Sequence, residues 1–204
     1  MKTIKEPVSA TLTEKGSRFT GFLFHIETRE RFDEKFDQLV SQHEDASHHC
    51  CAWRIGLDRI DEYANDAGEP SGTAGMPILN QLRSHDVSNT GLVVVRYFGG
   101  TKLGRSGLIK AYGRTAGLCL EKSRLVTIVP TRILEIVYAY DQENRVKQLE
   151  NRFGLKELET SYRQRVRKKF ACPQVHAAEC IEMLENLEHT GINLEVMGEG
   201  YLTQ

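Results

Sequence analysis

Two glycine-rich segments contain the residue types that bind anions in many proteins. The first, residues 66–77, reads DAGEPSGTAGMP, and Ser71 or Thr73 is expected to cap the helix that follows it. Glycine lets the backbone approach a bound group closely, and a helix N-terminus presents free N–H groups and a partial positive charge. Such a turn suits phosphate or carboxylate. The alternative, which is common for such segments, is that Ser71 only caps the helix and the glycines only form turns.

The second segment, residues 96–108, reads RYFGGTKLGRSGL and follows the apolar run Leu92–Val95. A buried strand that leads through a glycine-rich turn into a helix is the setting of a phosphate-binding loop, here with Gly99 and Gly100 in the turn. The turn nearly matches the P-loop pattern G-x-x-x-x-G-K-[ST], but Arg105 replaces the lysine. Because arginine is not equivalent to the lysine that reaches the terminal phosphates, a true P-loop is not expected.

Basic residues are concentrated around this second segment. Residues 96–124 include seven Lys or Arg and one acid, whereas residues 27–69 include twelve acids and five bases. Lys110 and Arg114 lie four residues apart and therefore share a helix face. We expect a cationic surface that contacts RNA phosphates, with an ordinary solvated helix face as the alternative. The expected members of this surface are Arg96, Lys102, Arg105, Lys110 and Arg114.

Candidates for catalysis are fewer, and no catalytic motif identifies them. His49, Asp66 and Glu69 would transfer a proton or hold a metal only if folding brought them together. The chain would then be an enzyme acting on a phosphorylated small molecule that both glycine-rich segments hold. The run His48–Cys51 lacks the ligand spacing of a zinc site, and its residues alternate between the faces of a strand. Buried cysteines are therefore expected, with no metal and no cofactor.

The spacing of apolar residues predicts a mixed α+β first domain, residues 1–130, that positions these segments. Its expected elements are a hairpin over 8–26 that turns at Lys15–Gly16, a helix over 29–42, strands over 50–55 and 60–64, a helix containing Met76, Leu79 and Leu82, the strand 92–95, and a helix containing Leu108, Ala111 and Leu118. Each glycine-rich segment leads into one of the last two helices. A domain boundary is expected near Pro130, which interrupts the β-branched run Leu125–Val129.

Residues 131–204 predict the order β-α-β-β-α-β, which is the ferredoxin-like arrangement. The residues expected to begin or end its two helices are Asp141, Gly154, Pro173 and Gly191. Three arginines alternate along the expected third strand and would share one face. They would either bind phosphate there or, by their charge, keep an exposed sheet edge from pairing with another strand. The three residues are Arg163, Arg165 and Arg167.

Composition excludes several classes of protein. The 204 residues are 40% hydrophobic and 27% charged, with a formal net charge of −1, which is typical of a soluble protein with one large or two small domains. No apolar run is long enough to cross a membrane, and the N-terminus lacks a secretory signal. Five cysteines form an odd count without framework spacing. We therefore expect a reduced, cytoplasmic protein that does not bind membranes.

Residues 68–75 (GEPSGTAG) and 94–104 (VVRYFGGTKLG) resemble the IMPACT family, and the resemblance extends over essentially the whole chain. It implies an N-terminal domain with the left-handed βαβ fold found in a small-subunit ribosomal protein and in domain IV of elongation factor G. It also implies a C-terminal ferredoxin-like domain similar to the last domain of that factor. The family pattern often has glycine where this chain has Arg105 and Ser106.

The resemblance also implies a function linked to translation. Eukaryotic relatives restrain the starvation-activated kinase that phosphorylates a translation initiation factor, by competing for the activator of that kinase. Those relatives have a different additional domain, whereas the two-domain length and the C-terminal half of this chain resemble bacterial members of the family. Bacteria lack that pathway, so this partner is not expected here. What the resemblance implies is regulation of translation through binding of RNA, a ribosome or a protein partner, without DNA sequence specificity.

Overall fold

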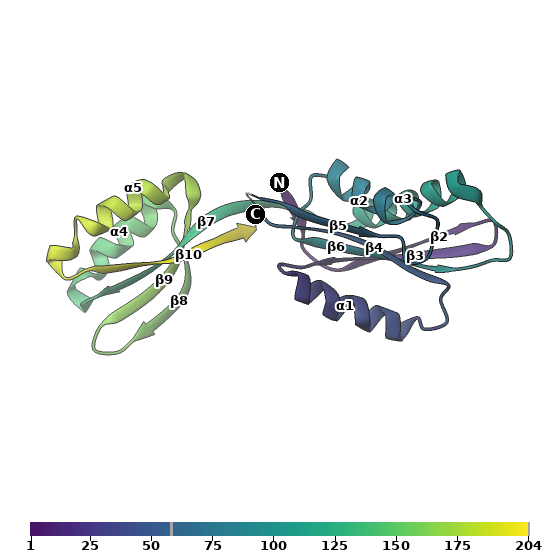
Figure 1. The fold of residues 1–204 in the computed structure, drawn as a ribbon. Helices are drawn as coiled ribbons and strands as arrows, with labels where there is room; N and C mark the ends of the chain where they lie inside the picture. Colours follow the sequence, from purple (N-terminus) through teal and green to yellow (C-terminus); the bar gives the residue numbers. More distant parts are fainter. Residues whose placement is uncertain (58, 204) are drawn as a thin grey trace. The chain divides into compact units, whose positions relative to one another are not determined.

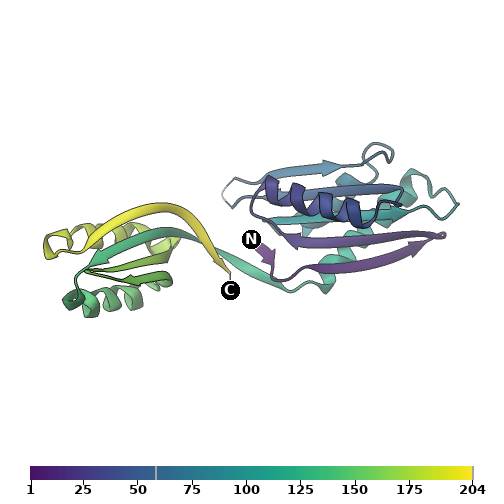
Figure 2. The same cartoon turned by 90° about the horizontal axis from the view of Figure 1, so that it is seen from below.

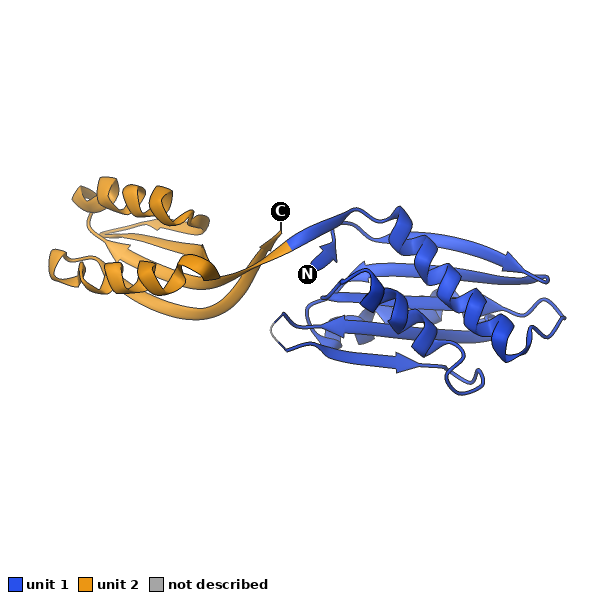
Figure 3. Cartoon of the chain, turned by 90° about the horizontal axis from the view of Figure 1, so that it is seen from above, with its two compact units in different colours: residues 1–127 blue, residues 128–204 orange. Residues whose placement is uncertain are grey.

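The computed structural model describes residues 1–57 and 59–203 (Figure 1). The chain divides into two compact units, Met1–Thr127 and Ile128–Gln204 (Figure 3). Both units combine helices with antiparallel strands, which confirms the expected α+β class. No helix among the described residues is both long and apolar enough to span a membrane.

The first unit is built on an antiparallel sheet with the strand order β2-β3-β6-β4-β5. The strands are β2 (Val8–Glu14), β3 (Ser17–His25), β6 (Thr90–Tyr97), β4 (His48–Ile55) and β5 (Asp61–Asn65). Strands β3 and β4 both pair antiparallel with β6, which lies between them, so they are parallel to each other. Helix α1 (Arg29–Gln42) makes the crossover between them and completes a βαβ unit.

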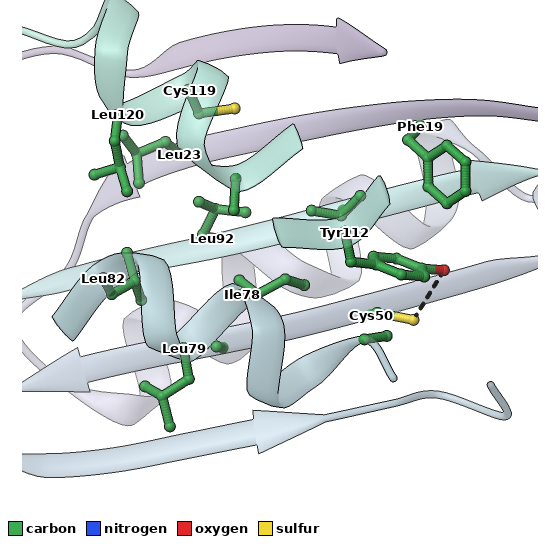
Figure 4. Packing of buried hydrophobic residues seen from close by; sticks show 14 of the residues in the cluster. Phe19, Leu23, Cys50, Ile78, Leu79, Leu82, Leu92, Tyr112, Cys119 and Leu120 are labelled. Carbon is green, nitrogen blue, oxygen red and sulfur yellow. Dashed lines mark hydrogen bonds between the residues drawn. The ribbon is translucent and has the colours of Figure 1, made fainter. Parts of the chain in front are cut away.

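Helices cover both faces of this sheet. Helix α1 lies on one face (Figure 2), and α2 (Gly75–Ser84) and α3 (Gly104–Lys122) lie on the other (Figure 1). The core under α2 and α3 is the larger one and includes Leu92 and Tyr112 (Figure 4). A sheet that is buried on both faces needs apolar residues at successive positions of its central strand, which explains the run Leu92–Val95.

Local signals explain several element boundaries. Strands β2 and β3 turn at Lys15–Gly16, where the φ angles are 46° and 81°, as a two-residue hairpin of the primed type requires. Helix α1 has the expected bounds, and its N-cap Thr28 accepts a hydrogen bond from the backbone N–H of Arg31.

The second unit has the ferredoxin-like order β-α-β-β-α-β, which confirms the prediction. Its elements are β7 (Leu125–Tyr138), α4 (Glu143–Phe153), β8 (Lys156–Tyr162), β9 (Val166–Pro173), α5 (Gln174–Glu185) and β10 (Asn193–Thr203). The strand order in the sheet is β10-β7-β9-β8. The short strand β1 (Lys2–Ile4) pairs with the first three residues of β7, which belong to the first unit.

Three expectations about where single strands and helices begin or end are wrong. Strand β7 runs through Pro130 without a break, because the pairing of β7 with β9 begins only at Thr131. A 3₁₀ turn over Tyr140–Gln142 leads into α4, so Asp141 is not its N-cap. Helix α5 ends at Glu185, and Gly191 instead ends a second 3₁₀ turn, with φ 85°.

A candidate anion-binding cleft

A row of three side chains crosses the sheet of the first unit. Phe19 on β3 and His48 on β4 both pair in register with Arg96 on β6. Residues that lie directly opposite each other on neighbouring strands point to the same face, and here that is the face under α2 and α3. The two glycine-rich loops meet beside this row.

The loops and two residues of the row, His48 and Arg96, line a cleft of about 460 Å³. Its walls combine apolar and charged side chains from β4, β6, both loops and the start of α3. They are His48, Glu69, Pro70, Arg96, Phe98, Lys102, Leu103, Gly104, Arg105 and Leu108. A volume of this size is within the usual range of small-molecule sites.

A buried ion pair lies at the base of the cleft. Arg96 Nη1 donates to Glu69 Oε1 at 2.6 Å, and the Tyr112 hydroxyl donates to the same oxygen at 2.8 Å. The two charged side chains are 6% and 4% exposed, so neither charge is solvated by bulk water. His48 Nε2 lies 3.9 Å from Glu69 Oε1, which is beyond hydrogen-bond distance. The pair therefore neutralises the charge of Arg96 within the protein.

The Arg96 guanidinium is held on several sides. Its Cζ atom lies 5.3 Å from the ring centre of Phe19 and 5.5 Å from that of Phe98, and Nη2 donates to Ser17 Oγ at 3.4 Å. Its Nε atom is buried and has no hydrogen-bond partner within the described part of the chain. The expectation that Arg96 belongs to an exposed cationic surface is wrong, because β6 is the central strand and both faces of the sheet are covered.

A thiol and a phenol continue the polar cluster into the core. Cys50 Sγ donates to the Tyr112 hydroxyl at 3.3 Å (Figure 4) and lies 3.0 Å from the carbonyl oxygen of Asp66. Burial raises the pKa of the Cys50 thiol to about 12 and the pKa of Tyr112 well above its usual value. Both groups are therefore neutral at neutral pH. Cys51 is buried in the core on the opposite face, under α1.

The first loop caps α2 with its own carboxylate. Asp66 accepts hydrogen bonds from the backbone N–H groups of Gly72 at 2.7 Å and of Ala74 and Gly75 at 2.9 Å each. Partial burial opposes the ionised form, but these bonds outweigh it and hold the pKa of Asp66 below its usual value. The anion site at the N-terminus of α2 is thus already occupied by Asp66.

Neither residue expected to cap α2 does so. The N-cap position belongs to Ala74. Thr73 is buried and donates from Oγ1 to the carbonyl oxygen of Pro70 at 2.6 Å. Ser71 is exposed, and its carbonyl oxygen accepts a hydrogen bond from Arg105 Nη2 at 2.8 Å, which links the two loops.

The second loop leaves the N-terminus of α3 uncapped by a side chain. Leu103 occupies the N-cap position and makes no side-chain cap hydrogen bond to the described residues. Gly100 and Gly104 have φ angles of 85° and 71°, so the chain turns sharply before the helix begins. Lys102 and Arg105 flank this N-terminus and are exposed. The free N–H groups of the first turn and two cations therefore lie together at the cleft.

Gly99 serves packing. A Cβ atom there would overlap the backbone of Gly16, in the turn between β2 and β3. The N–H of Gly99 donates to Ser17 Oγ at 3.1 Å. This close approach attaches the second loop to the hairpin turn, where Lys15 is a further exposed cation that the sequence reasoning missed.

The remaining expected cations lie along α3. Lys110 is exposed, and the exposed Arg114 pairs with Glu121 at 2.7 Å. Four of the five expected members are thus exposed and lie outside the buried pair at the base of the cleft, namely Lys102, Arg105, Lys110 and Arg114.

The expected constellation of His49, Asp66 and Glu69 does not form. The His49 side chain points to the α1 face, where Nε2 donates to the carbonyl oxygen of His43 at 3.1 Å, and Asp66 caps α2. His48 takes the place beside Glu69. The missing signal was the register of β4 against β6, which pairs His48 with Arg96 and cannot be read from the alternation of one strand alone.

The three arginines of the second unit do not alternate along one strand, because Arg163 and Arg165 precede β9, but all three line one hollow of this unit. Arg163 lies in the turn between β8 and β9, while Arg165 donates to the carbonyl oxygen of Gly191 and Arg167 pairs with Glu135 at 3.0 Å. The next residue, Lys168, is buried and contacts three glutamates. They are Glu143 at 2.9 Å, Glu150 at 3.2 Å and Glu157 at 3.5 Å.

Comparisons with known proteins give consistent matches. The family model for the Impact N-terminal domain matches residues 15–120, which include both loops. The IMPACT family member YvyE of Bacillus subtilis (strain 168) is 32% identical over 191 residues, which are 94% of this chain and 81% of that protein. The IMPACT family member YigZ of Escherichia coli (strain K12) is 31% identical over 195 residues, which are 95% of this chain and 96% of that protein. A crystal structure of a hypothetical protein is 31% identical, with 96% of both chains covered and a TM-score of 0.70.

Proposed function

The chain belongs to the IMPACT family, and on this premise we propose that it is a translation-linked regulatory protein whose first unit binds RNA of the translation machinery. The observation that carries the proposal is the open N-terminus of α3, a helix of 19 residues, with exposed Lys102 and Arg105 beside it. A helix N-terminus with two adjacent cations is suited to phosphate oxygens.

Further cations extend this phosphate-binding surface along α3. Lys110 and Arg114 are exposed on the outer side of the helix. The pair between Arg114 and Glu121 is solvent-exposed on both sides and contributes little to stability, so Arg114 is available to exchange its partner for a phosphate. Contacts of this kind read the RNA backbone rather than its sequence.

The geometry supports binding rather than catalysis. An enzyme acting on a phosphorylated small molecule was the alternative, with His49, Asp66 and Glu69 as its proton-transfer or metal-binding groups. His49 lies on the other face of the sheet, and the Asp66 carboxylate is engaged by three backbone N–H groups. Glu69 alone remains at the cleft, and its charge is paired with Arg96.

Salt-dependent RNA binding tests the proposal. The test variant replaces Lys102, Arg105 and Lys110 with glutamine, and the matched control replaces Arg29, Arg31 and Lys35 of α1, on the opposite face of the sheet. Fluorescence anisotropy with a labelled single-stranded RNA measures affinity across a salt series. Each lost phosphate contact lowers the slope of log affinity against log salt by roughly 0.7, so the test variant should lose about 2 from the slope and the control nothing.

Sedimentation tests the link to translation. The protein should migrate with ribosomal subunits through a sucrose gradient at low salt and be released at high salt. The proposal is contradicted if the test variant and the control bind RNA as the unmodified protein does, or if the protein never migrates with ribosomal subunits.

A further inference from the structure

An exposed aromatic ring stands at the mouth of the cleft. Phe98 is 50% exposed, although it lines the cleft and its ring centre lies 5.5 Å from the guanidinium carbon of Arg96. Its backbone N–H donates to Ser47 Oγ at 3.1 Å, which fixes the chain at this position. A half-exposed aromatic ring beside cations is the combination on which proteins stack the bases of single-stranded nucleic acids.

Hydrogen-bond donors and acceptors lie side by side at the base of the cleft, where Arg96 and Glu69 are both buried. Arg96 is 5% exposed overall, and its Nε–H lacks a partner among residues 1–57 and 59–203. His48 donates from Nδ1 to the carbonyl oxygen of Ala67 at 2.9 Å, and its Nε2 lies 3.9 Å from Glu69 Oε1. The Glu69 carboxylate adds acceptor capacity. A nucleobase edge, which carries donors and acceptors side by side, is complementary to such a set.

The charges around the cleft favour an anionic ligand. Among the charged lining residues, Glu69 is paired with Arg96, whereas Lys102 and Arg105 are exposed, and Arg105 also attracts the nearby Asp66 carboxylate. Arg105 uses one N–H for Ser71, and a guanidinium has five, so others remain for a phosphate. The open N-terminus of α3 adds backbone donors on the same side of the cleft.

We propose that this cleft binds a single nucleotide unit. The base stacks on Phe98 with its polar edge toward Arg96 and Glu69, and the phosphate is held by Lys102, Arg105 and the first turn of α3. The nucleotide has two possible sources with the same chemistry, an RNA strand and a free nucleotide. For the RNA strand, the inference rests on the proposed function. In either case, recognition of the base goes beyond contacts to phosphate alone.

Two RNA probes and one free nucleotide test the inference. The probes are a labelled eight-nucleotide adenine RNA and the same strand with abasic ribose units, and the free nucleotide is AMP. Stacking of one base is worth about 5- to 150-fold in affinity, so the intact strand should bind at least about 5-fold more tightly than the abasic one. Phe98→Leu should remove this preference and Phe98→Tyr should keep it. Tyr162→Leu, a change of an exposed ring in the second unit, should have no effect.

The outcomes separate the inference from the proposed function. Equal, salt-dependent binding of both strands, without saturable binding of AMP, would overturn the nucleotide site and leave backbone binding intact. Saturable binding of AMP that Phe98→Leu removes, without RNA binding, would uphold the nucleotide site and overturn the RNA proposal. If neither RNA strand nor AMP binds to the folded protein, both are overturned. Thermal unfolding of each variant verifies that it is folded.

Discussion

The two glycine-rich loops of the first unit are alike in sequence, but they differ in whether a side chain caps the helix that follows. Both lead into a helix, but the first loop caps the N-terminus of α2 with the carboxylate of Asp66, whereas no side chain among the described residues caps the N-terminus of α3. A glycine-rich turn before a helix is therefore open to an external anion only where no side chain of the protein caps the helix. The sequence contains that distinction, because residues 97–120 include no Asp or Glu.

The loops also differ in how they contribute to stability. The first loop supplies Glu69 to the buried pair with Arg96 and Asp66 to the cap of α2, so both of its carboxylates are engaged. The second loop and the start of α3 instead expose two cations, Lys102 and Arg105, of which Arg105 also donates to the carbonyl oxygen of Ser71. We therefore expect changes in the first loop to lower stability and changes in the second to lower binding.

The largest expected effect comes from breaking the buried pair. Glu69→Leu leaves the charge of Arg96 buried without compensation and should lower the free energy of unfolding by about 3–5 kcal/mol. The double variant Glu69→Leu with Arg96→Met removes both charges and should recover much of that loss. Urea denaturation measures both. If Glu69→Leu lowers the free energy of unfolding by less than about 1 kcal/mol, the pair does not stabilise the first loop.

The second-largest expected loss of stability comes from removing the carboxylate that caps α2. Asp66→Ala removes three charge-assisted hydrogen bonds and should lower the free energy of unfolding by about 2 kcal/mol, while Asp37→Ala on the exposed side of α1 should change it little.

The contribution of Asp66 should depend on pH with a definite sign. Because the folded state lowers the pKa of Asp66 below its usual value of roughly 3.9, this contribution is present above about pH 4 and is lost as the pH falls below it. A difference between Asp66→Ala and the unmodified protein that stayed constant down to pH 2 would contradict the assignment.

Much of the fold can be predicted from the sequence, because periodicity is a local property. The bounds of α1, the turn at Lys15–Gly16 and the order of the second unit all follow from apolar spacing and turn residues. The cap of α2 could not be predicted in this way, because Asp66 lies eight residues before Ala74 and reaches the helix only after the loop folds back.

The site was harder to predict because it depends on pairing between strands. His48 and His49 are equivalent in the sequence until the register of β4 against β6 places one of them beside Arg96. The burial of Arg96 likewise depends on β6 being the central strand, which local charge counts do not reveal. The exposure of Lys102 and Arg105 could be predicted, because charged side chains just before and inside the first turn of a helix usually remain in solvent.

The smallest expected effect comes from a substitution that places a carboxylate at the N-terminus of α3, as the first loop does at the N-terminus of α2. Ser106 is exposed in the first turn of α3, and Ser106→Asp places a carboxylate near the open N-terminus. Interaction with the helix dipole should raise the free energy of unfolding by about 0.5 kcal/mol, while the same charge should weaken RNA binding several-fold. The control Ser106→Asn adds no charge and should change binding little. An unchanged RNA affinity for the aspartate variant would place the phosphate elsewhere.

The most direct test of the difference between the loops is a titration of the ¹⁵N-labelled protein with inorganic phosphate, followed by the backbone amide shifts. We predict that saturable shifts concentrate in the first turn of α3, at Gly104, Arg105, Ser106 and Gly107. The amides of Gly72, Ala74 and Gly75 should stay unchanged, because Asp66 already occupies them. Shifts at the start of α2, or an absence of shifts at the start of α3, would contradict the account.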